Sequence, residues 1–443
     1  MKIRNSLIII ISLAFIIRII ASIWSFEYRE NTDVLRYKDW ARISYVYGLA
    51  ETYKTEHITF GTLPNNQPPG LLYILSASYR LHIQLSKMLL RVIPYSEKVN
   101  ALLNGPVMSF MLRLPSIISD CLIGILIFLF LKRFNRKRGV LLAPSLFLFN
   151  PVVIYNSAVW GQVDAIVNVS FLFSFWLLFN KHTFLSILLF SLCILTKFSL
   201  LYMTPFYLLF WSRELKNIWN YFHATVLASV AGIIFILPIS TNPFLWFLHF
   251  ISNNTTGEMT NITAFAMNVW WVIFRPFISI GNPNNLFSFS EVRLINSPDS
   301  STLWLGVPLF RWAVGLFIVF CIPLFLSIYK RKKLSIQYIF LVLTNCSLLA
   351  FILLPQMHER YMYPAFIFLA FSSVFFCRFI ISYVILSILN MINVYIVWHP
   401  MTIPFFPYQI WTGIWFQWLI SLCTVVTLCV VYIQTLRLLH EKK

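Results

Sequence analysis

Ionisable side chains interrupt an apolar sequence at a few places where they could act on a ligand at a membrane boundary. The segment "LLPQMHERYMYP" (353–364) places His358, Glu359 and Arg360 between two apolar runs. Histidine beside arginine suits a phosphate group, because the fork of guanidinium donors matches the phosphate oxygens. We expect Glu359 to orient one of its two neighbours.

Two carboxylates follow the first apolar segment, in "ENTDVLRYKDWAR". Asp33 lies nearest the membrane, and Asp39 follows six residues later. A carboxylate beside apolar surface can be tuned to act as a general base. A single loop aspartate is more commonly just solvated, and position alone does not decide between these readings.

Aromatic and amide side chains occur at two turns. "WGQVD" brings Trp160, Gln162 and Asp164 together, a combination typical of carbohydrate binding; the alternative is an interfacial tryptophan with ordinary turn residues. "NNQPPGLLYIL" contains Gln67 before two prolines that restrict the backbone. Gln67 either hydrogen-bonds a sugar hydroxyl or satisfies the turn.

Three further charges lie in or beside apolar helices. Arg113 and Asp120 are seven residues apart in "RLPSIISD" and so share a helix face. An unpaired charge at the centre of a spanning helix costs roughly 2.5 to 3.5 kcal/mol, which favours pairing or a watery cavity. A structural ion pair is an equally good reading. Lys197 in "LTKFS" either meets a phosphate or extends to the interface, the commoner state of a lone lysine.

The composition is that of an integral membrane protein. The 443 residues are 59% hydrophobic and 11% charged, whereas soluble domains are about one quarter charged. The net charge of +19 is concentrated in loops between helices, as expected for cytoplasmic loops, and we expect no nucleic-acid partner. The seven cysteines show no Cys-x-x-Cys spacing, so neither a zinc site nor a disulfide framework is predicted.

The hydrophobic pattern predicts an all-α, polytopic protein with about twelve transmembrane helices in a single membrane domain, 1–443. Apolar runs near the length of about 20 residues that a spanning helix needs recur along the chain. We expect both termini to be cytoplasmic. Two long loops are predicted outside, at 25–105 and 240–306, followed by C-terminal helices within 307–443. The piece 264–277 in the second loop is interpreted as interfacial or re-entrant, and the predicted helices are 1–24, 106–131, 139–157, 162–180, 184–196, 199–211, 219–239, 307–329, 336–355, 361–377, 379–397 and 410–435.

The order of these motifs resembles the GT-C superfamily of membrane glycosyltransferases. The segments "TDVLRYKDWAR", "NNQPPGLLYIL", "RLPSIISD", "WGQVDAI", "LTKFS", "AFAMNVWW" and "MHERYMYP" cover roughly 30–365. They are similar above all to prokaryotic relatives of the GPI-anchor second mannosyltransferase. They are also similar to the dolichyl-phosphate-glucose-dependent glucosyltransferases, which carry a His-Glu-Lys version of "HER".

The resemblance implies an inverting transferase that moves a hexose, with mannose the first choice, from a polyprenyl-phosphate donor on the outer side. It implies Asp33 as the general base, with Asp39 as the alternative, and a phosphate held by His358 and Arg360 with Lys197 and Arg113. Sugar or acceptor binding is expected at Gln67, Trp160, Gln162, Asp164, Asn268 and Trp271.

The expected partners are membrane lipid, the donor and an unidentified glycan, lipid or protein acceptor. The first loop lacks the acid-x-acid motif of metal-dependent relatives, so we expect no metal and no cofactor. The expected location is a prokaryotic plasma membrane, or the endoplasmic reticulum membrane in a eukaryote. The rival functions are a transporter or flippase of lipid-linked sugars and a glycan polymerase or ligase. A transporter often has internal repeats, and the sequence has none that we can detect.

Overall fold

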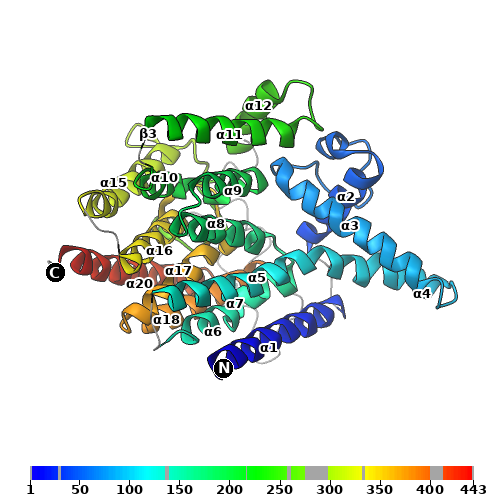
Figure 1. The fold of residues 1–443 in the computed structure, drawn as a ribbon, viewed down its shortest axis with the longest axis horizontal. Helices are drawn as coiled ribbons and strands as arrows, with labels where there is room; N and C mark the ends of the chain where they lie inside the picture. Colours follow the sequence, from blue (N-terminus) through cyan, green and yellow to red (C-terminus); the bar gives the residue numbers. More distant parts are fainter. Residues whose placement is uncertain are drawn as a thin grey trace. The chain divides into compact units, whose positions relative to one another are not determined.

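The structure, a computed structural model, describes residues 2–27, 31–134, 139–215, 217–256, 261–274, 298–331, 335–399 and 413–441 (Figure 1). Helices dominate these ranges, and the strands β1 to β4 are two residues long each. The predicted all-α class is therefore confirmed.

Seven helices among the described residues are long and apolar enough to cross a membrane. Helices satisfy their own backbone hydrogen bonds, which is the requirement for a chain in lipid. The protein is thus a multi-pass helical membrane protein, while the finer expectation of about twelve spans stays a prediction. The seven are Ile3–Trp24, Glu97–Arg133, Ile218–Ile236, Leu309–Tyr329, Ile336–Leu353, Phe379–Val397 and Trp415–His440.

The helix predicted at 139–157 is broken. It consists of α6 (Leu142–Leu148), α7 (Pro151–Ile154) and the π-helix η4 (Tyr155–Trp160), with a bend of 49° at the break. Pro151 has no backbone N–H to continue the first helix, and the Asn150 side chain accepts the N–H of Val152 instead. Counting this bent pair as one span gives up to eight spans.

The chain divides into two compact units, one made of 1–149 and 153–254 and the other of 150–152 and 255–443. We call them the N-terminal unit and the C-terminal unit and describe each by itself. The N-terminal unit contains α1 (Lys2–Trp24), η1 (Ser25–Glu27), α2 (Thr32–Val46), η2 (Leu49–Tyr53), α3 (Pro69–Leu89), α4 (Glu97–Leu102), η3 (Leu103–Val107), α5 (Met108–Arg133), α6, η4, α8 (Asp164–Phe179), α9 (Thr183–Thr196), η5 (Phe198–Met203), α10 (Thr204–Ser212), α11 (Ile218–Ile236) and most of α12 (Pro243–Thr256).

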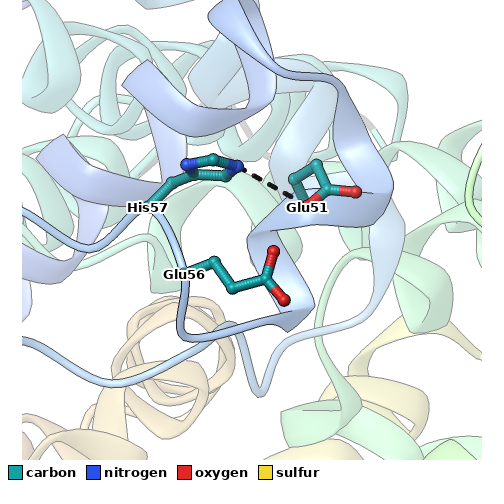
Figure 2. A group of neighbouring side chains, drawn as sticks. All are labelled: Glu51, Glu56 and His57. Atoms are coloured by element: carbon teal, nitrogen blue, oxygen red, sulfur yellow. Dashed lines mark ion pairs between the residues drawn. The ribbon is translucent and has the colours of Figure 1, made fainter.

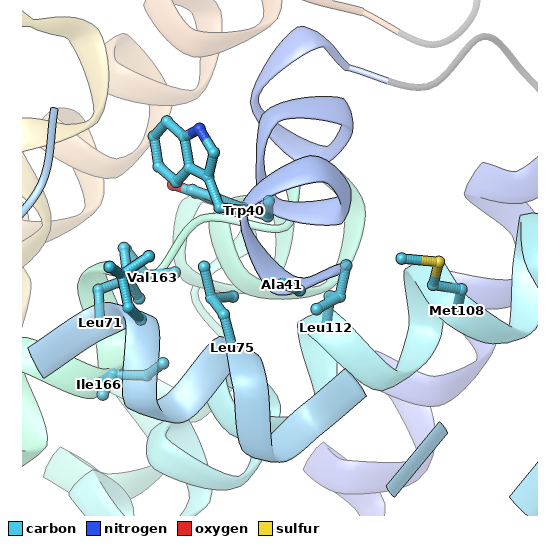
Figure 3. Close-up of a cluster of buried hydrophobic side chains, with 10 residues drawn as sticks. Trp40, Ala41, Leu71, Leu75, Met108, Leu112, Val163 and Ile166 are labelled. Atoms are coloured by element: carbon cyan, nitrogen blue, oxygen red, sulfur yellow. The ribbon is translucent and has the colours of Figure 1, made fainter. Parts of the chain in front are cut away.

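The first predicted outer loop, 25–105, is helical for much of its described length, and its helices α2 and α3 pack against each other and against α5 of the same unit. Trp40 and Ala41 of α2 contact Leu71 and Leu75 of α3, and Leu112 of α5 lies in the same apolar cluster (Figure 3). Burying these side chains is the main force that holds α2 on the spanning helix α5. This cluster therefore holds α2 and α3 in place against α5.

The C-terminal unit is built around α16, which is almost entirely buried. Its neighbours α15, α17 and α20 pack against it, and α18 packs against α17 and α20. The elements are β1 (Thr263–Ala264), β2 (Leu303–Trp304), β3 (Val307–Pro308), α15 (Leu309–Tyr329), α16 (Ile336–Leu353), β4 (Met357–His358), η7 (Glu359–Met362), α17 (Tyr363–Phe375), α18 (Phe379–Val397) and α20 (Ile414–His440). Strands β1 and β4 pair in parallel, and β2 and β3 pair antiparallel.

The predicted second outer loop, 240–306, lies partly outside the described residues. Its described part begins with α12 and includes β1 and a helical stretch at 269–274. That stretch lies within the piece 264–277 predicted to be interfacial or re-entrant, of which 275–277 are outside the described residues. The single-domain prediction and the assignment of the loops to the outer side stay predictions.

Candidate functional site

Asp33 lies in the first turn of α2, just after the chain leaves the spanning helix α1. Asn31 caps this helix by accepting the Asp33 backbone N–H at 2.8 Å. The Asp33 Oδ2 atom accepts hydrogen bonds from Trp160 Nε1 at 3.2 Å and from Gln162 Nε2 at 2.5 Å. The side chain is partly exposed. The predicted base and two predicted sugar-binding residues, 127 and 129 positions away, therefore meet in one group.

Gly161 lets the turn of "WGQVD" approach α2 and α5 closely. Its φ of 84° lies in the left-handed region that favours glycine. A Cβ atom there would lie 2.9 Å from Val34 Cγ2 and 3.0 Å from Arg113 Nε. The backbone N–H groups of Gly161 and Gln162 both donate to Asn156 O, which fixes the turn. Trp160 and Gln162 thereby reach Asp33.

Asp39 has a different environment. Its fully buried carboxylate accepts the backbone N–H groups of Thr59 and Phe60 and the hydroxyl of Thr62, at 2.8 to 3.0 Å. Arg42 Nη2 lies 3.5 Å from Oδ1 of the same carboxylate. These bonds attach the segment 59–62 to α2. Of the two aspartates, Asp33 is the one whose carboxylate is accessible to a hydroxyl group from solvent.

Lys197 and Asp164 form a buried ion pair. Lys197 Nζ lies 2.6 Å from Asp164 Oδ1, and the two side chains are 6% and 4% exposed. Asn156 Nδ2 donates to the other carboxylate oxygen at 3.3 Å. Next to this pair, a Cβ atom on Gly70 would lie 2.7 Å from Thr196 Oγ1, so the "PPG" and "TK" motifs touch. Lys197, predicted to bind phosphate, and Asp164, predicted to bind the sugar or acceptor, therefore form an ion pair with each other.

Gln67 lies in a turn held by other side chains. Its backbone carbonyl accepts the Tyr53 hydroxyl at 3.1 Å and Asn65 Nδ2 at 2.9 Å. Its side-chain amide donates to Asn66 Oδ1 at 2.8 Å and is partly exposed. The predicted role in sugar binding stays a prediction.

Arg113 and Asp120, predicted to share a helix face, have partners on other elements. Arg113 donates to Ser25 Oγ at 2.6 Å. Asp120 pairs with Arg18 of α1 at 2.8 Å, with both side chains fully buried, and it accepts the Ser157 hydroxyl at 2.6 Å. Asp120 is therefore in a buried ion pair, and this pair joins α1 to α5. Asp120 also contacts η4 through Ser157, which lies three residues before Trp160.

His358, Glu359 and Arg360 form a turn between β4 and α17. Arg360 Nη1 lies 3.0 Å from Glu359 Oε1, and His358 Nδ1 lies 3.8 Å from Glu359 Oε2. Burial raises the pKa of the Glu359 carboxyl, but His358 and Arg360 outweigh burial, and the resulting pKa lies below its usual value. The side chains of His358 and Arg360 are 17% and 13% exposed, so both are open to a ligand.

The predicted residues Asn268 and Trp271 lie on the segment that follows β1. Because β1 pairs with β4 in the register Ala264 to His358, this segment runs beside the "HER" turn. Asn268 is buried and donates to Phe351 O at 3.3 Å. Trp271 is 7% exposed. The structure thus joins the "AFAMN" and "HER" motifs, which are almost one hundred residues apart.

A group of side chains in the first loop has ligand atoms that a divalent cation can use. Glu51, Glu56 and His57 place one such atom each within 4.8 Å of one another (Figure 2). His57 stacks on Tyr47, and Lys54 pairs with Glu51 at 2.7 Å. The Lys54 ammonium already neutralises one carboxylate, and these side chains are accessible to water. The group is best described as a solvated ion-pair cluster.

Sequence reasoning missed three residues that position these groups. Arg18 carried a usable signal, because a lone arginine in an apolar spanning helix needs a partner. Asn390 and Asn393 on α18 donate to backbone carbonyls of the two joined motifs of the C-terminal unit. Neither has a signal in the sequence beyond being an amide within a long apolar helix.

The described structure defines a helical multi-pass membrane protein, and each of its two units contains part of the predicted set of site residues. The N-terminal unit contains Asp33 with Trp160 and Gln162, and the C-terminal unit contains His358 and Arg360. Comparison of the chain with protein-family models gives no match, and comparison with the curated proteins gives none.

Proposed function

We propose that the protein is an inverting glycosyltransferase that moves a hexose from a polyprenyl-phosphate donor to an acceptor hydroxyl. The observation that carries the proposal is the Asp33 carboxylate, which is held by Trp160 and Gln162 and remains partly exposed. A general base must be fixed in orientation and reachable by the proton that it removes. Asp39 is fully buried and already bonded, which favours Asp33 for this role.

In the proposed reaction Asp33 takes the proton from the acceptor hydroxyl. The acceptor oxygen attacks the anomeric carbon on the face opposite the phosphate, and the bond from that carbon to the phosphate oxygen breaks. Its electron pair leaves with the polyprenyl phosphate, and the configuration at the anomeric carbon inverts. Trp160 is 3% exposed and donates its indole N–H to Asp33, so in this reaction it orients the base.

Cations near the departing phosphate stabilise the charge that grows on it in the transition state. His358 and Arg360 suit this task because both are partly exposed, and Glu359 fixes the guanidinium. Lys197 and Arg113 have partners inside the N-terminal unit. We therefore assign the phosphate first to His358 and Arg360.

The finer topology belongs to the same proposal. With about twelve spans and cytoplasmic termini, the positive-inside rule places the first loop and the "HER" turn outside. That side is the outer face of a prokaryotic plasma membrane or the lumen of the endoplasmic reticulum. Mannose is the first donor sugar to test.

The decisive experiment measures consumption of polyprenyl-phosphate mannose and polyprenyl-phosphate glucose by purified protein in a membrane lipid extract. Asp33→Asn keeps an oxygen that accepts both N–H groups, so the fold should survive while turnover falls by about a thousandfold, near the middle of the range for a lost general base. Glu51→Gln, in the same loop, is the matched control and should retain activity.

Full turnover by Asp33→Asn would remove this residue from the role of base. A wild-type protein that consumes neither donor would overturn the transferase. If labelled lipid-linked sugar then crosses liposomes that contain the protein, the transporter is the correct function.

A further inference from the structure

Two buried asparagines on α18 are three residues apart and so lie on one face of this helix. Asn390 and Asn393 are each 2% exposed. Asn390 Nδ2 donates to the backbone carbonyl of Glu359 at 2.7 Å. Asn393 Nδ2 donates to Phe265 O at 2.9 Å, and Asn393 Oδ1 accepts the Met267 N–H at 3.0 Å.

These three hydrogen bonds reach two segments that are distant in the sequence. One is the "HER" turn, and the other is the segment 263–268 that ends at Asn268. The two segments also meet directly, over a short stretch: β1 and β4 pair in parallel over two residues each, and Phe265 bridges His358. Gln356 N donates to Ile262 O at 3.0 Å, and Ala266 N donates to Met357 O at 3.2 Å. A strand pair this short fixes the relative position of two ligand-binding segments poorly.

Phe265 gives the clearest sign of an imposed conformation. Its φ of 72° is in the left-handed region, which a bulky side chain rarely adopts. The two bonds of Asn393 follow it directly, at the Phe265 carbonyl and at the Met267 N–H, and so lie on either side of Ala266. Such backbone conformations persist when the surroundings over-determine them, and they cluster at ligand-binding sites.

We propose that Asn390 and Asn393 are positioning residues that hold the 263–268 segment and the "HER" turn together as one binding surface for the donor. The proposal deepens the proposed function, on which its donor-binding part rests. It also explains why a spanning helix keeps two buried amides, since polar groups inside a membrane are costly and mark function. Neither residue is proposed to touch the reacting atoms.

The test compares Asn390→Leu and Asn393→Leu with Asn393→Asp, which keeps the acceptor for Met267 and loses the donor to Phe265. The matched control is Asn345→Leu on α16, a buried amide that bonds Leu341 O and Thr435 Oγ1. The first readout is hydrogen–deuterium exchange of peptides covering 261–268 and 357–362. We expect exchange to become about tenfold faster per lost hydrogen bond in the leucine variants. In the Asn393→Asp variant Met267 should keep more of its protection.

The second readout is the KM for the polyprenyl-phosphate donor. It should rise about tenfold in the leucine variants, by the same reasoning, with a smaller change in kcat. Unchanged exchange, or equal acceleration in Asn345→Leu, would overturn the anchoring role. Faster exchange with an unchanged KM would overturn the donor-binding role. A wild type that consumes no donor refutes the proposed transferase, whereas the exchange data still decide the anchoring.

Discussion

The ion pair between Lys197 and Asp164 supports a prediction that can be worked through from the structure. The two groups are 2.6 Å apart and at most 6% exposed. Removing one partner of a buried pair leaves an uncompensated charge and costs about 3–5 kcal/mol, whereas removing both partners costs much less. We therefore expect Asp164→Asn and Lys197→Met each to lower the free energy of unfolding by about this amount, and the double variant to recover much of it.

The measurement is a double-mutant cycle on unfolding in mixed detergent micelles, followed by tryptophan fluorescence. The coupling between the two substitutions should exceed about 2 kcal/mol, because residues in direct contact couple by up to about 3 kcal/mol. The exposed pair of Glu51 and Lys54 is the control. Its cycle should show no measurable coupling, since water screens exposed charges. Additive losses at 164 and 197 would refute the pair as the structure has it.

The same variants separate two roles for Lys197. If Lys197 acts through Asp164, donor turnover lost in Lys197→Met should return in part in the double variant. If Lys197 binds the donor phosphate, as the resemblance implies, the KM stays high in both. The second result would show that the pair opens when the donor binds.

Three further predictions concern the turn, the "HER" group and metal. Gly161→Ala should lower the free energy of unfolding by about 2 kcal/mol or more, through a left-handed φ and a clash with Val34; Gly61→Ala, with a φ of 64° and open space around it, should cost less in the same assay. The lowered pKa of Glu359 contributes stability that is fully present above its ordinary value of 4.5 and is lost as the pH falls through the lower pKa of the folded protein. Thermal unfolding between pH 6 and 3 should show this loss in the wild type and not in Glu359→Gln. Chelation by EDTA should leave donor consumption unchanged, and activity that is lost and then restored by Mg²⁺ or Mn²⁺ would contradict this.

Helix boundaries in the N-terminal unit were predictable where an apolar run of helical length is bounded by polar or turn-forming residues. The helices predicted at 162–180 and 184–196 correspond to α8 and α9. The break at Pro151 was not predicted, because proline is tolerated in some spanning helices where neighbouring groups satisfy the freed backbone. Whether it bends a particular span depends on those neighbours, which the sequence does not specify.

The candidate residues were predictable as types, but their partners were not. Arg113 and Asp120 share a helix face, yet Asp120 bonds Arg18 and Arg113 bonds Ser25. Lys197 was expected at a phosphate or at the interface, and it lies in a buried pair. A charge in an apolar helix indicates that a partner is needed. Which residue becomes the partner depends on which helices pack beside it.

The sequence by itself determined the class of this protein, because apolar length and the shortage of charge leave helices across a membrane as the stable arrangement. It also singled out the short polar motifs, since buried polar groups in such a chain are costly enough to stand out. Tertiary structure decided which of two acids is exposed: Asp39 is bonded by the segment 59–62, whereas Asp33 faces Trp160 and Gln162. It also joined Asn393 to the 263–268 segment and Asn390 to the "HER" turn. These hydrogen bonds join residues between 20 and 129 positions apart, and they depend on packing that no local pattern encodes.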